Sequence, residues 1–381
     1  MSDLNLLAGV PTFLKLTERF KSSKNPRAFT QLFMQGGVEK TDGDTAIYEL
    51  LINDRKLAAP RGRRATGFRR DSIANKYVEQ GLIHAKETER IYPDELFLNA
   101  AYGTPMKANA GAVIAKTAAR IYNRLLLFRE YVCARYLQDS AGVSLNASNT
   151  DFDAGAVQQA QNVVMRGGLV TQTAGAAWST PATKMLSGTA QLPAFLNAIE
   201  ANGYEGVRLI INRNTAKSVA GNTEAQTWLT NNGNITVNHI KEFSNALGDP
   251  QSRAGRDPFE KNILSGLGGI PAWHVWHHGF EKRDDSFTTF MDDDKAILLP
   301  SFDPSEGESP IALAEGPSII PNPQQAIGNG EEASKLFSQQ RGIVIWAYRE
   351  PGDTGALVIV GEDHFLPLVK DNNSVLQING L

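Results

Sequence analysis

Apolar residues recur at alternating spacings of four and three along residues 105–138, and this is the strongest periodic pattern in the chain. The members of the stripe are Ile114, Ala118, Ile121, Leu125, Phe128 and Val132. This spacing places side chains on one face of an α-helix, and Pro105 stands in the first turn, where proline is tolerated. A helix of this length spans about 45 Å. We therefore predict one long helix that packs by this stripe against a sheet containing the C-terminal strands.

Shorter apolar runs, bounded by glycine, proline and asparagine, predict strands. Two of them precede the helix, at 46–52 and 81–85, and the tail at 375–378 can add a last strand. The strands predicted between are 163–165, 169–171, 177–179, 207–211, 235–237, 270–276, 288–291, 296–300, 342–348 and 356–360, and the helices are 191–201 and 212–232. Because strands and helices alternate over about 190–335, we predict a central sheet with flanking helices there.

The segment between the first two strands is strongly basic, since residues 55–70 hold seven lysines and arginines and no acidic residue. Pro60, Gly62 and Gly67 interrupt this segment, which is typical of the tip of a long hairpin that projects from the body. The arginines clustered at the predicted tip are Arg61, Arg63, Arg64, Arg69 and Arg70. A solvated surface loop explains the same block of like charges equally well, so the pattern alone leaves both interpretations open.

Composition narrows the class of protein. With 381 residues, the chain is too long for one compact core, and two or three domains are expected. Apolar residues make up 41% and charged residues 21%, which is an ordinary soluble globular composition. A net charge of −3 is unlike the basic balance of most nucleic-acid-binding domains. We expect neither a membrane span nor a secretory signal.

Polar and reactive side chains within the long helical pattern have structural explanations. Arg120, Arg124 and Arg129 lie off the apolar stripe, so we expect them to be exposed or paired with neighbouring residues. Cys133 is the single cysteine, which excludes an intrachain disulfide and fits a reducing cytoplasm. Because no histidine or aspartate stands near it in the sequence, we expect a buried thiol rather than a nucleophile.

Three of the six histidines, His274, His277 and His278, stand close together, and they raise the hypothesis of a metal site with the aspartates at 292–294. On a strand, His274 and His278 share a face but lie about 13 Å apart, too far to bind one ion. The three aspartates stand between two predicted strands, so a hairpin turn explains them.

Motifs of known catalytic chemistry are missing from the sequence, including the phosphate-binding loops and the GxSxG nucleophile elbow. No pair of carboxylates stands out either. We therefore assign no catalytic, cofactor-binding or metal-ligating residue and expect a protein that is not an enzyme.

The order of the predicted parts resembles the major capsid fold of tailed phages, which encapsulins share. An arm, a long hairpin, one exceptional helix, a mixed α/β segment and a return to strands follow one another in that fold. The C-terminal half is similar to the lambda-type capsid family. The stretches that carry this similarity are 177–179, 206–212, 269–271, 290–299 and 348–360.

This resemblance implies an α+β fold with four parts. They are an N-terminal arm at 1–45, an extended hairpin loop at 46–92, a peripheral domain with the spine helix at 93–189 and 341–381, and an axial α/β domain inserted at 190–340. The resemblance further implies self-assembly into hexamers and pentamers of an icosahedral shell around double-stranded DNA. The arginines of the hairpin tip are then the expected subunit interface.

The resemblance also implies the partners and the location of the protein. A separate scaffold, a portal and a cement protein are the expected protein partners, and packaged DNA makes non-specific contacts. The expected location is the virion capsid, assembled in the host cytoplasm, with no cofactor and no membrane. The alternatives are an encapsulin-like nanocompartment shell protein, a metal-dependent hydrolase that uses the histidines, and a monomeric binding protein with a basic loop.

Overall fold

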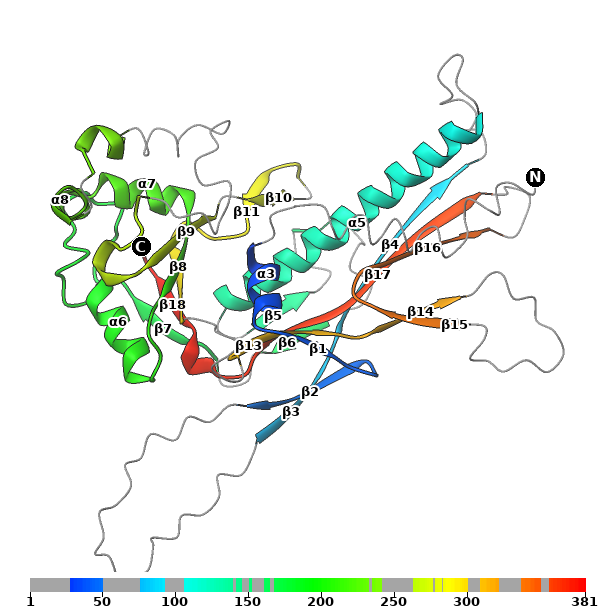
Figure 1. The fold of residues 1–381 in the computed structure, drawn as a ribbon, viewed down its shortest axis with the longest axis horizontal. Helices are drawn as coiled ribbons and strands as arrows, with labels where there is room; N and C mark the ends of the chain where they lie inside the picture. The colour runs from blue at the N-terminus through cyan, green and yellow to red at the C-terminus, as the bar shows by residue number, and fades with distance from the viewer. Residues whose placement is uncertain are drawn as a thin grey trace, which may run out of the picture.

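The computed structural model describes most of the chain, and the long helix is its dominant element (Figure 1). The described residues are 28–50, 76–92, 106–139, 142–145, 151–152, 161–164, 168–232, 235–241, 263–276, 278–282, 284–300, 309–321, 337–350 and 356–381. The helix, α5 (Met106–Gln138), has 33 residues and lies along the first of two five-stranded sheets, here called the spine sheet. Its bounds confirm the predicted helix.

Strand β17 (Leu357–Val369) is the central strand of the spine sheet. It pairs antiparallel with β4 (Ile83–Ile91) along one edge. Along its other edge it pairs antiparallel with β13 (Ile311–Glu315) and β16 (Val344–Arg349). Strand β1 (Val38–Lys40) extends the sheet by pairing parallel with β13. This 13-residue strand therefore joins strands from the N-terminal and the C-terminal parts of the chain in one sheet.

The apolar stripe of α5 packs on this sheet, as predicted. Ile121 and Leu125 are buried in one cluster with Ile345 and Ile359 of the sheet. The contact is so close that a Cβ atom added at Gly361 would lie 2.4 Å from Ile121 Cγ2 and 2.8 Å from Leu125 Cδ1. Only glycine at that position lets the helix approach the strand to this distance.

The second sheet has the strand order β7–β18–β12–β8–β9 and a core of its own. Its strands are β7 (Val170–Thr173), β18 (Leu376–Asn379), β12 (Lys295–Leu299), β8 (Arg208–Asn212) and β9 (Ala272–Trp276). Helices α6 (Leu192–Ala201), α7 (Arg213–Gly221) and α8 (Thr223–Asn232) lie around it (Figure 1). The predicted sheet with flanking helices is confirmed.

Sheet membership does not follow sequence order. Strand β13 lies within the segment predicted as axial, yet it belongs to the spine sheet. After β17 the chain passes through a short 3-10 turn, η3 (Asn372–Ser374), and enters the second sheet as β18. The tail strand predicted at 375–378 therefore lies between β7 and β12, and it ties the two sheets together.

Helix α3 (Ala28–Gln35), which the sequence reading did not predict, is anchored on α5. The carboxylate of Glu130, on α5, is buried and accepts hydrogen bonds from the backbone N–H groups of Phe29 (3.0 Å) and Thr30 (2.8 Å). These first-turn N–H groups have no partner within their own helix, and a carboxylate is the favoured group at the positive end of the helix dipole.

The remaining strands form two-stranded ribbons, and a short 3-10 turn precedes β9. The ribbons are β2 (Thr45–Leu50) with β3 (Lys76–Gly81), β5 (Gly142–Leu145) with β6 (Gln161–Val164), β10 (Gly279–Glu281) with β11 (Phe287–Thr289), and β14 (Pro317–Pro321) with β15 (Phe337–Arg341), and the turn is η1 (Leu267–Gly269). The first ribbon is the stem of the predicted hairpin. The second strand of the stem is β3. The sequence predicts residues 81–85 as this second strand, but most of them belong to β4 of the spine sheet.

Three local predictions were wrong, and side-chain caps and turns explain them. Residues 237–241 are helical rather than part of a strand, because Thr236 Oγ1 accepts from His239 N–H (3.3 Å) and starts the helix. The helix predicted at 212–232 is two helices, because the Asn222 side chain accepts from the N–H groups of the residues that open α8. Residues 177–179 form a turn, in which the Trp178 indole donates to Gln191 (2.7 Å).

We predict that Leu125→Asp abolishes soluble expression. Leu125 is buried between α5 and the spine sheet, so an aspartate there is an unpaired buried charge that costs several kcal/mol, about 3–5. Ala112→Asp, at an exposed position of the same helix, is the control and should leave expression and urea unfolding unchanged. A soluble Leu125→Asp protein of normal stability would contradict the packing of the spine.

Candidate functional site

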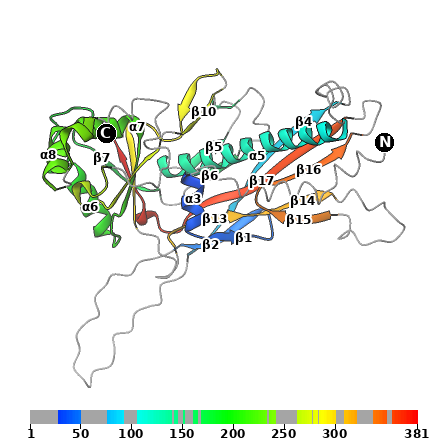
Figure 2. The same ribbon diagram turned by 45° about the horizontal axis from the view of Figure 1, so that its top comes forward.

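The stem of the hairpin has one packed face and one exposed face. Residues alternate along β2, so Ala46 and Tyr48 are buried together with Val78 of β3. On the other face, Ile47 is 66% exposed and Tyr77 is 63% exposed. The stem lies on the opposite side of the spine sheet from α5 (Figure 2). Two large apolar side chains thus face outward on a two-stranded ribbon.

The arginines predicted at the hairpin tip lie outside the described residues. Arg61, Arg63, Arg64, Arg69 and Arg70 all fall between β2 and β3. Their role as a subunit interface stays a prediction.

The charged flank of α5 pairs with strand β4. Arg120 bonds Glu89 at 2.6 Å and Arg124 bonds Glu87 at 3.3 Å, with both arginine side chains about half exposed. Two of the three off-stripe arginines therefore pair with neighbouring residues of the same chain, as expected. Such exposed pairs contribute about 0–1 kcal/mol each.

The third arginine, Arg129, is buried instead of exposed. Its guanidinium forms a two-pronged interaction with Asp363 on β17, with Nε 2.9 Å from Oδ2, and donates to Glu315 on β13 at 2.7 Å. Burial opposes the charge on Arg129, but the two carboxylates outweigh it and keep the pKa of the guanidinium above its ordinary value. Helix α5 is thereby fixed to two strands of the spine sheet.

Cys133 is buried on the same helix, as predicted. Burial raises the pKa of its thiol well above the ordinary value, which keeps the sulfur protonated and unreactive.

Among the residues that the structure describes, the histidines and aspartates weighed in the sequence do not gather into a group of three metal ligands. His274 is buried on β9 beside Ile210 of β8, and His277 lies outside the described residues. Asp292 accepts from Arg135 at 3.0 Å, and Asp293 accepts from Asn214 at 3.0 Å. These aspartates are not a hairpin turn, because β11 and β12, which flank them, belong to different sheets. Asp292 instead connects the second sheet to α5.

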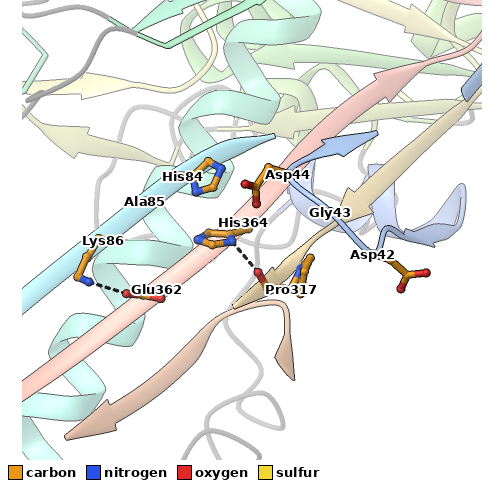
Figure 3. Close-up of a pocket in the computed structure, with 9 residues that line it drawn as sticks. All are labelled: Asp42, Gly43, Asp44, His84, Ala85, Lys86, Pro317, Glu362 and His364. Atoms are coloured by element: carbon orange, nitrogen blue, oxygen red, sulfur yellow. Dashed lines mark hydrogen bonds and ion pairs between the residues drawn. The ribbon is translucent and has the colours of Figure 1, made fainter. Parts of the chain in front are cut away.

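A different cluster lies beside the hairpin stem (Figure 3). Within the part of the chain that the structure describes, Asp44, His84 and His364 are the one group of three whose ligand atoms all lie within 4.8 Å of one another. They line a cavity of about 580 Å³ together with Lys86 and Glu362, which pair at 2.7 Å. No local pattern in the sequence indicates this group, because its members are far apart along the chain.

The two histidine rings of this cluster lie close together, with centroids 4.1 Å apart and their planes tilted by 48°. Desolvation lowers the pKa of His84, and the neighbouring His364 lowers it further, while Asp44 and Glu362 act in the opposite direction. The net shift favours a neutral imidazole at His84.

Comparison with known proteins identifies the family. The sequence model described as "Phage major capsid protein E" matches residues 12–308, which is more than half of the chain. The chain belongs to this family of phage major capsid proteins. This capsid protein is therefore a shell-forming subunit of a tailed phage, located in the virion capsid. No curated protein matches its sequence.

Several solved structures are similar to this chain. A phage-related protein from Bordetella bronchiseptica RB50 is similar with a TM-score of 0.50 and 13% identity, over 96% of this chain and 95% of that chain. A structure from Gordonia phage Cozz has a TM-score of 0.43 and 13% identity, over 94% and 88%. The mature capsid of bacteriophage PhiM1 has a TM-score of 0.47 and 6% identity, over 91% and 86%. The similarity to the Bordetella protein shows that the two chains share a fold.

Among the described residues, none of the helices is both long and apolar enough to cross a membrane.

We predict that Arg129→Met destabilises the capsid protein by about 3–5 kcal/mol, because it leaves Asp363 buried without its cation. Arg120→Met removes the same group from the same helix at a half-exposed position and should cost about 0–1 kcal/mol. Urea unfolding of the two variants measures the difference. Equal losses of stability would contradict the anchoring role of Arg129.

Proposed function

We propose that this capsid protein forms hexamers and pentamers of an icosahedral shell around double-stranded DNA, with each hairpin covering part of a neighbouring subunit. The family match over residues 12–308 is the observation that carries the proposal. In this proposal the four parts predicted from the sequence remain, but strand β13 is assigned to the peripheral domain and strand β18 to the axial domain, because they belong to the spine sheet and to the second sheet, respectively. Membership of the lambda-type branch stays a prediction.

The exposed face of the hairpin stem supports a role in contact between subunits. Ile47 and Tyr77 lie on the same outer face of a ribbon, diagonal to each other across the strands. Exposed apolar groups of this size on a projecting element are favourable only where another surface covers them. A neighbouring copy supplies that surface in a shell, where every subunit repeats the same contact.

The basic tip supports the same role through charge. Seven cations between positions 55 and 70 repel one another, so an acidic surface on a neighbour stabilises them. The acid-rich stretch from Glu281 to Glu308 is the proposed partner, and its residues Glu281, Asp284 and Asp285 are exposed. Asp292 is less available, because Arg135 and Lys295 already pair with it.

The partners and chemistry of the shell complete the proposal. A scaffold, a portal and a cement protein are separate partners, DNA is bound non-specifically, and assembly takes place in the host cytoplasm. The subunit has no catalytic role. An encapsulin-like shell is the second candidate, since it shares the fold, but no observation favours it over the phage capsid.

The central test is electron microscopy of the expressed protein, which should show shells or capsomers. Arg63→Glu with Arg64→Glu should leave the circular dichroism and melting of the monomer unchanged while blocking assembly. Because screening weakens such contacts, high salt should weaken wild-type assembly in the same direction. Lys217→Glu with Lys241→Glu changes the charge equally at exposed positions of other helices and is the control. Normal shells from the hairpin variant would leave the tip as a solvated loop.

A second variant tests the stem. Ile47→Ser with Tyr77→Ser should change the free energy of unfolding by less than about 0.5 kcal/mol per site, since both side chains are exposed. The protein concentration needed for assembly should rise severalfold, as measured by light scattering. Val237→Ser, an exposed apolar position outside the hairpin, should assemble like the wild type. Unchanged assembly of the stem variant argues against coverage of this face by a neighbour.

A further inference from the structure

The cluster of Asp44, His84 and His364 joins three separate parts of the fold (Figure 3). Asp44 directly precedes β2 of the hairpin stem, His84 is the second residue of β4, and His364 lies on β17. The backbone of Asp44 is itself fixed, since its carbonyl accepts a hydrogen bond from Leu82 N–H at 2.8 Å. The cluster therefore sits where the hairpin meets the spine sheet.

Strand register brings the two histidines together. His84 lies directly opposite His364 in the antiparallel pair β4–β17. The side-chain amide of Gln161 donates to His84 O (2.9 Å) and accepts from His84 N–H (2.8 Å), so the backbone polar groups of His84 point away from β17. Opposite residues that do not share backbone hydrogen bonds have the closer side chains in an antiparallel pair.

The carbonyl group of Pro317 sets the tautomer of His364. Its Nδ1 atom lies 2.8 Å from the carbonyl oxygen of Pro317. A carbonyl oxygen only accepts, so Nδ1 carries the proton and Nε2 of the neutral ring keeps its lone pair. An imidazole held by a carbonyl on one nitrogen and open on the other is the usual arrangement of a metal-ligating histidine.

Asp44 is the carboxylate near the two histidines that we assign as the third ligand, because the other nearby carboxylates are paired with cations. Glu362 pairs with Lys86, and Asp42 pairs with Arg341, so both of these neighbouring carboxylates already have a cation. The cavity that the cluster lines, about 580 Å³, is open and has room for an ion with bound water.

We propose that Asp44, His84 and His364 bind one divalent transition-metal ion, with Zn²⁺ as the best fit. Two imidazole nitrogens and one carboxylate oxygen are ligands that suit Zn²⁺, and water completes a four-coordinate site. The ion holds the root of the hairpin against β4 and β17. This site is independent of the shell function proposed above, because it is complete within one chain.

Metal binding is tested on the purified full-length chain after treatment with a chelator. Titration calorimetry with Zn²⁺ should give one equivalent per chain, and Co²⁺ should give the intense visible absorption of a four-coordinate site. His84→Gln and His364→Gln should each weaken Zn²⁺ binding at least about tenfold. His239→Gln, at an exposed histidine of the helical residues 237–241, is the matched control and should bind like the wild type.

Hydrogen exchange tests the effect on the hairpin. Zn²⁺ should slow exchange of the backbone amides in β2, β3 and the start of β4 in the wild type, and should have no effect in His84→Gln. Circular dichroism of each variant shows that the fold is kept. Less than one equivalent of Zn²⁺ in the wild type, or unchanged binding by the double variant His84→Gln with His364→Gln, overturns the proposal. Shells that form without taking up Zn²⁺ overturn the metal site and leave the capsid function standing.

Discussion

The contact between α5 and β17 is the interaction on which the rest of the structure depends. Apolar side chains of the helix pack on the strand so closely that Gly361 has no room for a side chain. Next to this apolar contact, the buried Arg129 binds Asp363 on the same strand and Glu315 on its neighbour. The apolar surface supplies the stability, and the ion cluster fixes the position of the helix along the strand, because a shifted helix would leave buried charges unpaired.

The elements that build a shell are attached to this spine. Helix α3 is held on α5 through Glu130, and the second sheet is tied to the spine by β18, which directly follows β17 in the chain. The hairpin stem is attached at its base, where β1 leads into β2 and β3 leads into β4. A rigid body with a projecting ribbon fits a capsid subunit, because each copy must keep its shape while it contacts several neighbours. The proposed ion site lies at the root of that ribbon, where it would limit the movement of the hairpin.

Much of this architecture could be predicted from the sequence because it is encoded locally. The spacing of Ile114 to Val132 predicts a helix and its buried face, since the period of a helix is written in consecutive residues. The hairpin stem, the sheet with flanking helices and the resemblance to phage capsids rest on patterns of the same kind. The local errors fell at caps and turns, as at Thr236 and Asn222, where a single side-chain hydrogen bond decides the backbone conformation.

Only the tertiary structure decided which distant segments meet. Arg129 looked like its exposed neighbours in the sequence, and its burial depends on Asp363, 234 residues away. His84 and His364 become a pair only through the register of β4 on β17. The sequence by itself determined the long helix, the strands of the second sheet and the resemblance to phage capsids, because these depend on the order of nearby residues. Strand register and sheet membership determined the buried ion cluster and the histidine pair, because pairing between strands joins residues with no local relation.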